Sequence, residues 1–456
     1  MLAAGENTAV VHTAGNGGGK GLTNGRRARF GAVAAVLHSR LSPGERFDEW
    51  RRIRRGDARV IIGARSAVFA PCVDLGLIIL DEEQEHSYKS ENSPRYDARE
   101  VAIWRGAKEH ALVLLGSATP SVESMHRAKS GDYRLYTLKE RYGGKPLPEV
   151  DIIDMRQELK YGNDLSLSNA LQNAIRDTEQ AGKQAILFLN RRGNSRCVVC
   201  VDCRETPECP RCSVRLTYHS ANNRLMCHYC GHSRPAPEKC PSCGGPMKTI
   251  GTGTQKLQQE LELIFPEYET ARMDADTVNA VNTHEKILEH FKNDKVPVLI
   301  GTQMVAKGLN LPDVTLVGVL DAELSLYNSS YRAAETTFNM LTQVVGRAGR
   351  GDAPGRAIIQ TNNPDHEVIE LASMQDYETF YRRTIRLRRA LTFPPYCDIV
   401  LLTVTGKVEP EVLKASNALN ESLRALTGSE KYRELPFIMF GPFEAPVYRV
   451  DGKYRM

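Results

Sequence analysis

Residues 75–84 read LGLIILDEEQ, a short apolar run that ends in acidic side chains. A fully apolar run of this length is typical of a strand that is buried on both faces of a parallel sheet. Ligands of such sheets bind at the carboxyl ends of the strands. There, one carboxylate can hold Mg²⁺ through its water shell while the next orients a hydrolytic water. We therefore predict that Asp81 serves a metal and Glu82 the water; taken alone, the stretch is equally compatible with an exposed acidic loop.

The pattern around this strand alternates strands with helices and indicates an α/β fold. We expect strands at 59–64, 75–80 and 111–116, and helices at 45–56 and 97–110. A second series has helices at 168–182, 255–265 and 284–293, with strands at 185–190, 296–301 and 314–320. Short apolar strands between helices predict parallel sheets covered on both faces.

Gly- and Pro-containing segments and changes in composition suggest the domain boundaries. The predicted segments are a poorly ordered N-terminal stretch (1–25), a first lobe (26–141), a Gly- and Pro-containing linker (142–150), a second lobe (151–385), a cysteine-rich insertion within it (194–248), and a small α+β C-terminal domain (386–456) that may be cut short.

Composition excludes several classes of protein. With 41% hydrophobic and 25% charged residues, the 456-residue chain is neither disordered nor fibrous. No apolar run approaches the ~18 residues of a membrane span, and the N-terminus lacks a secretory pattern. We expect a cytoplasmic protein with reduced thiols and no membrane partner.

Eight of the eleven cysteines form four CxxC pairs within the insertion. The pairs are Cys200 with Cys203, Cys209 with Cys212, Cys227 with Cys230, and Cys240 with Cys243. In a reduced chain such clustering indicates metal binding rather than disulfides. Four pairs supply two tetrahedral all-thiolate sites, which are structural zinc sites because no coordination position stays open. Metal binding would then stabilise a segment too poor in apolar residues to fold alone.

Positive charge gathers in the same region. Residues 190–250 hold ten Lys or Arg against four Asp or Glu, which favours a phosphate backbone as partner. A second candidate DNA contact follows the acidic motif, where Tyr88 and Tyr96 are interleaved with Lys89 and Arg95. Aromatic faces can stack on bases while cations neutralise phosphates; packing in the protein interior is the alternative for the tyrosines.

Two further motifs complete a nucleotide-handling set. GSATPS (116–121) follows the strand after the acidic motif, and QVVGRAGRG (343–351) lies near the end of the second lobe. On a helix Arg347 and Arg350 would share one face and could reach a γ-phosphate. With Gln343 they are the candidate catalytic residues of the second lobe.

These motifs, in this order, resemble the superfamily 2 helicases, and most closely the primosomal protein N′ family of PriA-type replication-restart helicases. The resemblance extends from about residue 22 to the end. It is carried by the stretches LHSRLSPGERFDEWRRIRRGDARVIIGARSAVFAP (37–71), LIILDEEQEHSYK (77–89), LLGSATPSVES (114–124), GTGTQKLQQEL (251–261), GTQMVAKGLNLPDVTLVGVLDAELSL (301–326) and YRAAETTFNMLTQVVGRAGRG (331–351), together with the cysteine spacing.

The resemblance implies two RecA-like lobes that bind ATP and Mg²⁺ between them and translocate 3′ to 5′ on single-stranded DNA. Members of this family act at stalled or repaired forks and D-loops and help to reload the replicative helicase. Expected partners are therefore DNA, primosome and helicase-loading proteins, and single-stranded DNA-binding protein. By family pattern, Lys307 and Gly308 couple nucleotide to DNA.

The resemblance also implies a nested zinc pairing. The outer cysteines (Cys200, Cys203, Cys240 and Cys243) would hold one ion, and the inner ones (Cys209, Cys212, Cys227 and Cys230) the other.

One element of the family pattern is not found. The phosphate-binding loop, GxGKT after a strand, has as its only counterpart GNGGGKGLT (15–23), in which Lys20 is followed by Gly21 instead of the Mg²⁺-binding Ser or Thr. Gln84 also stands in place of the usual histidine, although its amide can still donate and accept hydrogen bonds. Asn310 replaces an aspartate.

Three interpretations therefore stay open. The chain is an ATP-dependent replication-restart helicase, a zinc-stabilised DNA-binding and primosome scaffold that has lost hydrolysis, or a truncated product of a longer helicase gene. Without the loop, we expect DNA-stimulated ATP hydrolysis near background.

Overall fold

The computed structural model describes residues 7–12, 31–38, 41–90, 93–138, 144, 146–190, 197–200, 202–203, 205, 207–211, 216–219, 224–227, 232–250, 253–274, 283–302, 311–327, 330–349, 351, 353–432, 434–445 and 447–456. Contacts divide the chain into two units. The first unit holds residues 1–191 and 258–397, and the second holds residues 192–257 and 398–456.

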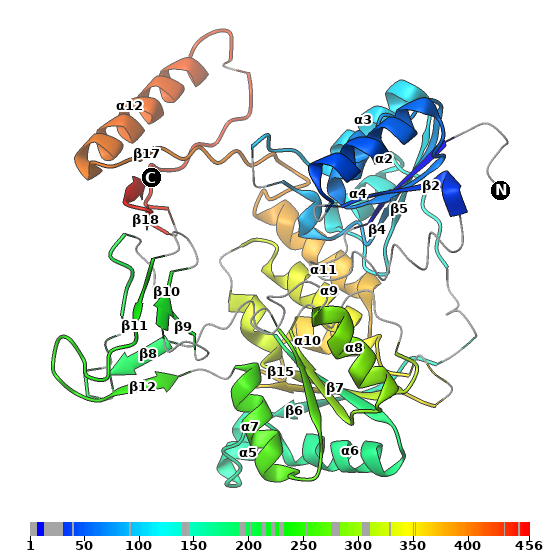
Figure 1. The fold of residues 1–456 in the computed structure, drawn as a ribbon. Coiled ribbons are helices and arrows are strands. Elements are labelled where there is room, and N and C mark those ends of the chain that lie inside the picture. Colours follow the sequence, from blue (N-terminus) through cyan, green and yellow to red (C-terminus); the bar gives the residue numbers. More distant parts are fainter. Residues whose placement is uncertain are drawn as a thin grey trace. The chain divides into compact units, whose positions relative to one another are not determined.

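The first lobe of the first unit is a parallel five-stranded sheet in the order β2-β3-β1-β4-β5 (Figure 1). Its strands are β1 (Asn7–His12), β2 (Ala34–Leu37), β3 (Val60–Gly63), β4 (Leu75–Asp81) and β5 (Leu112–Gly116). Helices α2 (Pro43–Arg55) and α3 (Ala98–Glu109) bury Ile53, Ala98 and Ala102 in one core with β3 and β4. The predicted strands and helices of this lobe are thus confirmed.

Local chemistry explains where α2 begins and ends. Ser42 and Glu45 form a reciprocal cap, in which Ser42 N–H donates to Glu45 Oε2 (2.8 Å) and Glu45 N–H donates to Ser42 Oγ (3.3 Å). The helix ends at Gly56, whose φ of 81° is a left-handed conformation that glycine adopts without strain.

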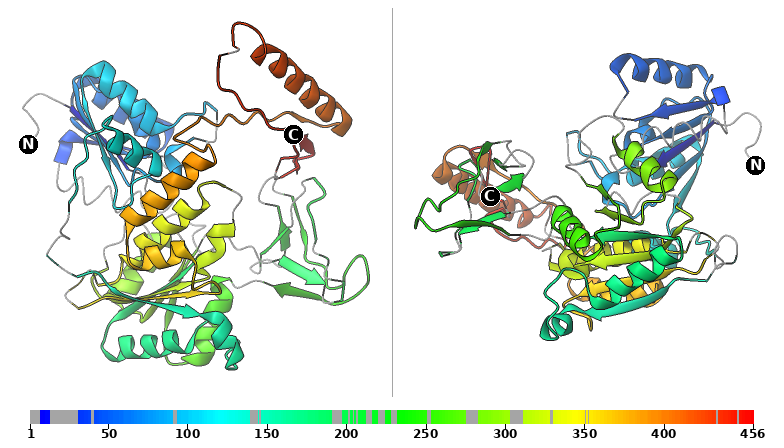
Figure 2. Two further views of the ribbon diagram at one scale, coloured as in Figure 1. Left: turned by 180° about the vertical axis from the view of Figure 1, so that it is seen from behind. Right: turned by 60° about the horizontal axis from the view of Figure 1, so that its bottom comes forward.

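The N-terminal stretch contains the central strand of this sheet. Strand β1, dark blue in Figures 1 and 2, pairs in parallel with β3 on one side and β4 on the other. The prediction of poor order for residues 1–25 is therefore wrong for residues 7–12. Six residues between Gly-rich and polar segments give no strong periodic signal, and the pairing with two distant strands decides their conformation.

The two faces of this sheet differ. Ile78 and Leu80 of β4 are buried under α2 and α3, whereas Leu112 and Leu114 of the edge strand β5 are 67% and 46% exposed on the other face. The expectation of strands covered on both faces is not met for β5 in the part of the chain that the structure describes.

The second lobe is a parallel six-stranded sheet in the order β13-β14-β7-β15-β16-β6. Its strands are β6 (Glu149–Asp154), β7 (Gln184–Leu189), β13 (Thr270–Met273), β14 (Val298–Gly301), β15 (Val314–Leu320) and β16 (Arg356–Thr361). The first of these, β6, starts inside the predicted linker and closes one edge of the sheet.

Helices lie on both faces of this second sheet (Figure 1). They are α5 (Met155–Lys160), α6 (Asn169–Gln180), α7 (Thr254–Ile264), α8 (Thr283–Asn293), α9 (Ala333–Val345), α10 (Glu367–Ser373) and α11 (Tyr377–Ala390). One core joins Ile186 and Phe188 of β7 to Phe338 and Leu341 of α9. Each fully buried side chain of this kind contributes about 1.5–3 kcal/mol through the hydrophobic effect. The predicted α/β class with two parallel-sheet lobes is confirmed.

The second unit combines the cysteine-rich insertion with the C-terminal residues. It contains a β-ribbon of β8 (Cys197–Cys200) and β12 (Met247–Ile250), a three-stranded sheet of β9 (Thr217–His219), β10 (Arg224–Met226) and β11 (Ser233–Pro235), helix α12 (Glu409–Thr427), and a sheet of β17 (Thr405–Gly406), β18 (Arg449–Val450) and β19 (Lys453–Arg455). The boundary between the units follows Cys397, which leaves α11 with the second lobe. The sequence predicted that the C-terminal domain begins at residue 386.

Candidate functional site

The acidic motif lies where β4 ends, at the carboxyl edge of the first sheet. Asp81, the last residue of β4, is exposed and pairs in register with His12, the last residue of β1. Glu82 follows with a left-handed backbone (φ 52°), a conformation that costs a non-glycine residue free energy and is enriched at functional sites. Its N–H donates to Asp81 Oδ1 (3.1 Å). Both predicted carboxylates thus lie at the edge where ligands of such sheets bind.

Gln84 connects Glu82 to the SAT motif. Its Nε2 donates to Glu82 Oε2 (2.7 Å), and its Oε1 accepts from Ser117 Oγ (2.5 Å). A second link joins the backbones, since Glu83 N–H donates to the carbonyl of Gly116 (3.0 Å). The glutamine therefore uses both functions of its amide, as expected for a substitute for histidine.

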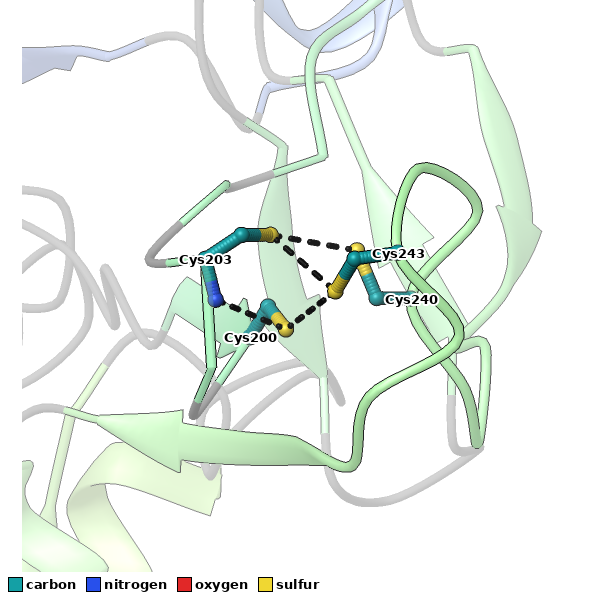
Figure 3. Close-up of side chains that lie close together, drawn as sticks. All are labelled: Cys200, Cys203, Cys240 and Cys243. Atoms are coloured by element: carbon teal, nitrogen blue, oxygen red, sulfur yellow. Dashed lines mark hydrogen bonds between the residues drawn. The ribbon is translucent and has the colours of Figure 1, made fainter.

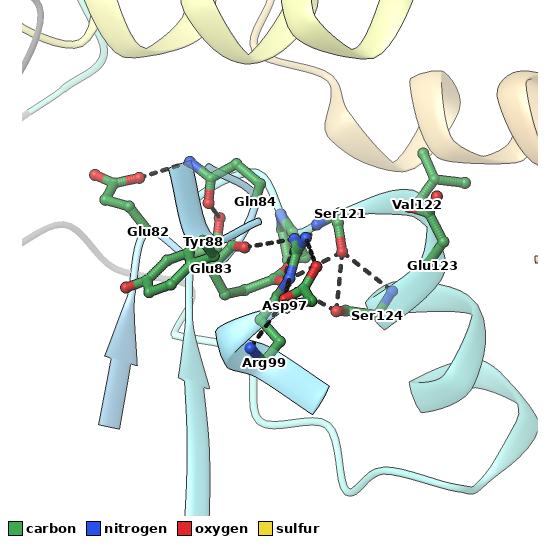
Figure 4. Close-up of polar contacts among 12 residues, drawn as sticks. Glu82, Glu83, Gln84, Tyr88, Asp97, Arg99, Ser121, Val122, Glu123 and Ser124 are labelled. Atoms are coloured by element: carbon green, nitrogen blue, oxygen red, sulfur yellow. Dashed lines mark hydrogen bonds and ion pairs between the residues drawn. The ribbon is translucent and has the colours of Figure 1, made fainter. Parts of the chain in front are cut away.

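Glu83 is the third carboxylate of the motif, and only 1% of its surface is exposed. It accepts from Ser121 N–H (2.6 Å), Ser121 Oγ (3.2 Å) and Ser124 Oγ (2.9 Å) at the start of α4 (Val122–Ser130), as Figure 4 shows. Arg99 lies on its other side and donates to the Glu83 carbonyl (2.9 Å). Glu83 is not among the residues that the sequence motifs single out. One signal could have identified Glu83, namely its position just after a buried strand. A charged residue that is buried there needs hydrogen-bonding partners.

Asp97 fixes Arg99 in this position. It caps α3 by accepting from Arg99 N–H (2.9 Å), and it accepts again from the Arg99 guanidinium (2.7 Å). Burial alone would raise the pKa of Asp97, but the hydrogen bonds and charge of Arg99 hold that pKa below its usual value.

The acidic loop also touches helix α9 of the second lobe. His86 Nε2 lies 3.1 Å from Thr336 Oγ1. Gln343 lies near the end of the same helix, where its side chain is half-buried. Arg347 is 93% buried and lies in the turn that follows, because α9 ends at Val345. The prediction that Arg347 and Arg350 share a helix face is therefore wrong for Arg347, and Arg350 lies outside the described residues.

The glycines of GRAGRG permit a close backbone approach after α9. A Cβ on Gly349 (φ 69°) would meet the backbone nitrogen of Gly355 at 2.5 Å, and one on Gly355 would meet the backbone of Ala348 at 2.5 Å. Only residues without a side chain fit this crossing. The turn that carries Arg347 is thus tightly fixed.

The four predicted DNA-contact residues divide into two groups. Lys89 and Arg95 are exposed, and Tyr96 is half-buried with its ring edge-on to Phe69 (4.8 Å between centroids). Tyr88 is fully buried, and its hydroxyl donates to the carbonyl of Asp81 (2.7 Å). The prediction that Tyr88 stacks on a base is wrong for this structure, because a buried ring offers no face to DNA; it packs instead, which was the alternative.

The outer cysteines converge in the second unit, as Figure 3 shows. The four Sγ atoms of Cys200, Cys203, Cys240 and Cys243 all lie within 4.8 Å of one another. The Sγ–Sγ separations are 3.3 Å for Cys200–Cys243, 3.6 Å for Cys203–Cys240 and 3.4 Å for Cys203–Cys243. A tetrahedral zinc ion with Zn–S bonds of about 2.3 Å places its sulfurs about 3.8 Å apart. The donor set and its size therefore fit zinc.

Of the inner cysteines, Cys209 and Cys227 are buried in a small core, whereas Cys212 and Cys230 lie outside the described residues. Strands β18 and β19 form a C-terminal hairpin, and its residue Val450 packs against that core. The hairpin is held further by Gly452 N–H, which donates to the carbonyl of Arg211 (2.8 Å) between the paired cysteines. The C-terminal residues thus pack directly on the turn that carries the second predicted metal site.

The predicted coupling residues Lys307 and Gly308 also lie outside the described residues, as does Lys20 of the Gly-rich stretch. Among the helices that the structure describes, we find none with the length and apolarity that a bilayer crossing requires.

Comparison with known proteins identifies the relatives of this chain. Residues 209–235 match the PriA DNA helicase Cys-rich region domain, and residues 248–352 match the helicase conserved C-terminal domain. The chain is 45% identical over 435 residues to the replication restart protein PriA of Bacillus subtilis, covering 95% of this chain and 53% of that protein. It is 41% identical over 429 residues to the protein of the same name from Treponema pallidum, covering 94% of this chain and 64% of that protein. The expected resemblance is confirmed, and the chain spans 53% and 64% of the lengths of these two relatives.

Solved structures show more distant likeness. RecG bound to a three-way DNA junction matches 91% of this chain and 44% of its own with a TM-score of 0.46 at 14% identity. Dbp5 of S. cerevisiae bound to RNA and ADP BeF3 matches 84% of this chain and 81% of its own with a TM-score of 0.46 at 11% identity.

Proposed function

We propose that this relative of the PriA-type replication restart proteins is an ATP-dependent DNA helicase that moves 3′ to 5′ at stalled or repaired forks and promotes reloading of the replicative helicase. The observation that carries the proposal is the contact set of the acidic loop. Its residues bind the SAT motif through Gln84 and Glu83 and touch α9 of the second lobe through His86. A hydrolysis site joined to both lobes is what a nucleotide-driven motor requires.

The ATP site lies, in this proposal, at the carboxyl edge of the first sheet. A magnesium ion there would neutralise charge on the phosphates. Asp81 would hold the ion through its water shell, and Glu82 would orient the attacking water. Gln84 restrains the Glu82 carboxylate by donating to it. Arg347 and Arg350 would stabilise charge on the γ-phosphate, with Gln343 beside them.

Two zinc ions are the proposed resident metals. The cluster of Cys200, Cys203, Cys240 and Cys243 supports the first site. The burial of Cys209 and Cys227 in one core supports the second, which Cys212 and Cys230 would complete. The ions would stabilise the fold, because four thiolates leave no position open for substrate.

DNA is the proposed substrate, in the form of forks, D-loops and single strands. Exposed Lys89 and Arg95, half-buried Tyr96, and the excess of positive charge over residues 190–250 support it. Primosome and helicase-loading proteins and single-stranded DNA-binding protein are the proposed protein partners. Since the relatives are named as replication proteins, we place this chain in the cytoplasm with the chromosome.

One observation favours a second candidate, a DNA-binding primosome scaffold without hydrolysis. Gly21 follows Lys20, so the hydroxyl that binds Mg²⁺ in a phosphate-binding loop is missing from that position. A chain that forms both lobes and the zinc unit but turns over ATP at background rate would fit this candidate.

Strand displacement distinguishes the two candidates. The helicase candidate predicts that Gly21→Thr, which restores the missing hydroxyl, releases a duplex strand with ATP from a substrate with a 3′ single-stranded tail. It predicts no release from a substrate with a 5′ tail, and none when Gly21→Thr is combined with Glu82→Gln. If the Gly21→Thr chains with and without Glu82→Gln bind forks equally tightly and neither releases a strand with ATP, the result would favour the scaffold.

A further inference from the structure

Helix α4 is encoded with the first lobe but packs into the core of the second. Val122 is fully buried and Met125 is 93% buried, and both belong to the core that contains Phe338 and Leu341 of α9. Tyr377 of α11 adds a polar contact, because its hydroxyl donates to the carbonyl of Pro120 just before the helix (2.8 Å). The helix therefore packs with the second lobe, while its sequence connects it to the first.

The N-terminus of α4 joins carboxylates from the two lobes. Ser121 N–H donates to Glu83 Oε1 (2.6 Å) in the acidic loop, and Val122 N–H donates to Glu335 Oε1 (3.0 Å) on α9. The first amides of a helix lack partners within it and carry partial positive charge, so both carboxylates are held strongly. Figure 4 shows Ser121, Val122 and Glu83 at this junction.

Arg388 of α11 holds Glu335 in place. Its side chain is 2% exposed, and its Nη2 donates to Glu335 Oε2 (2.6 Å) while its Nη1 lies 3.2 Å from Glu123 Oε1. Arg332 also pairs with Glu123 (2.5 Å). Arg388 thus connects Glu335, which accepts from the Val122 amide of α4, with Glu123 in the first turn of α4.

The two carboxylates of this cluster differ in proton affinity. Burial, followed by the charge of Glu123, raises the pKa of Glu335, and the charge of Arg388 opposes that shift. Burial alone would also raise the pKa of Glu123, but Arg332 and Arg388 hold it below its usual value. One arginine thus stands between two acids, and its removal would leave both with less compensation.

We propose that Arg388 and Glu335 are positioning residues for ATP hydrolysis, which fix the start of α4 and through it the acidic loop that carries Glu82. The chain of contacts runs from Arg388 to Glu335, to the Val122 amide, to the adjacent Ser121 amide, and to Glu83, the neighbour of Glu82 in sequence. The inference rests on the proposed function only for its catalytic consequence, since the mechanical link is testable without hydrolysis.

Hydrogen–deuterium exchange on the full chain tests the link. In Arg388→Met and in the milder Glu335→Gln we expect the amides of 119–124 and of 81–84 to exchange about tenfold faster, because each loses a restraint of the size of one buried hydrogen bond. Lys129→Ala is the matched control, since it removes an exposed ion pair of α4 with Glu378 on α11 and should leave both segments unchanged. A role confined to packing in the second lobe would accelerate 119–124 alone. Unchanged exchange at 81–84 in both variants overturns the proposal.

Hydrolysis supplies the second readout. In a chain that turns over ATP, Glu335→Gln should lower kcat about tenfold and leave KM for ATP within about twofold, because it displaces a catalytic group without removing a substrate contact. If neither the parent chain nor Gly21→Thr turns over ATP, the proposed function fails, and the exchange result still decides the link. Changed exchange at 81–84 with kcat unaltered would overturn the positioning role.

Discussion

His12 and Asp81 are register partners at the carboxyl ends of β1 and β4, two neighbouring strands of the first sheet. Strand β1, which precedes the Gly-rich stretch in sequence, therefore ends beside the acidic motif. The sequence shows no sustained apolar period before that stretch and predicts poor order for residues 1–25. The pairing of β1 brings His12 to the same edge of the sheet as Asp81.

The central position of β1 predicts a strong effect of proline there. Val10 pairs with Ile62 of β3 and Ile79 of β4. Val10→Pro removes a backbone donor from a central strand and should lower the free energy of unfolding by about 1–3 kcal/mol. Chemical denaturation measures this, with Val10→Ala, which keeps the N–H, as the control. Equal stability of the two variants would show that the backbone hydrogen bonds of β1 with β3 and β4 do not stabilise the sheet.

Metal content should follow the cysteine pairs. We expect two zinc ions per chain by elemental analysis. Cys203→Ser combined with Cys243→Ser should leave one, and Cys72→Ser, outside the insertion, should leave two. The C-terminal hairpin packs beside Cys209, so Cys209→Ser should also expose residues 449–455 to protease. Fewer than one ion in the parent chain would contradict the assignment.

DNA binding should depend on the exposed cations of the loop after the acidic motif. Lys89→Ala and Arg95→Ala should each lower affinity for single-stranded DNA, and each should reduce the slope of log K against log salt by about one. Tyr88→Phe is the control. It removes the hydrogen bond to Asp81 at a cost of about 1 kcal/mol of stability and should leave the salt slope unchanged. Unchanged salt slopes in both Lys89→Ala and Arg95→Ala would contradict the assignment of these cations to the DNA backbone.

His290 gives the second lobe a pH-dependent contribution to stability. Hydrogen bonds with Asp294 (2.7 Å) and Glu269 (3.0 Å) raise its pKa above 6.5. A pKa raised by folding stabilises the folded state fully below pH 6.5 and loses that effect as pH rises through the folded pKa. The Tm of the parent chain should therefore exceed that of His290→Gln near pH 6, with the difference disappearing at alkaline pH. A difference that grows with pH would contradict this.

Local patterns predicted much of the fold but not its long-range contacts. LGLIILDEEQ sufficed to place a buried strand and to put Asp81 at its carboxyl end, because apolar runs and turn residues act locally. The helix expected at 45–56 likewise corresponds to α2. Residues 7–12 were missed because only strands some 50 to 70 residues further along the chain complete their pairing.

The polar centre of the first unit shows the same limit. Val122 and Glu335 are 213 residues apart in sequence, and Glu335 and Arg388 are 53 apart. Both charged residues lie on amphipathic helices, where sequence alone assigns them to a solvated face. The prediction for Tyr88 was wrong for a related reason. A sequence that alternates aromatic and cationic residues is the same whether the aromatic ring faces DNA or packs in a core.

The central claim, a nucleotide-driven motor, is tested most directly by restoring the hydroxyl that Gly21 lacks. DNA-stimulated ATP hydrolysis should be near background in the parent chain and should rise at least about tenfold in Gly21→Thr, a change of about 1.4 kcal/mol in the activation barrier. The rise should vanish in Gly21→Thr/Glu82→Gln. Turnover that stays at background in Gly21→Thr, or that persists without Glu82, would contradict the claim.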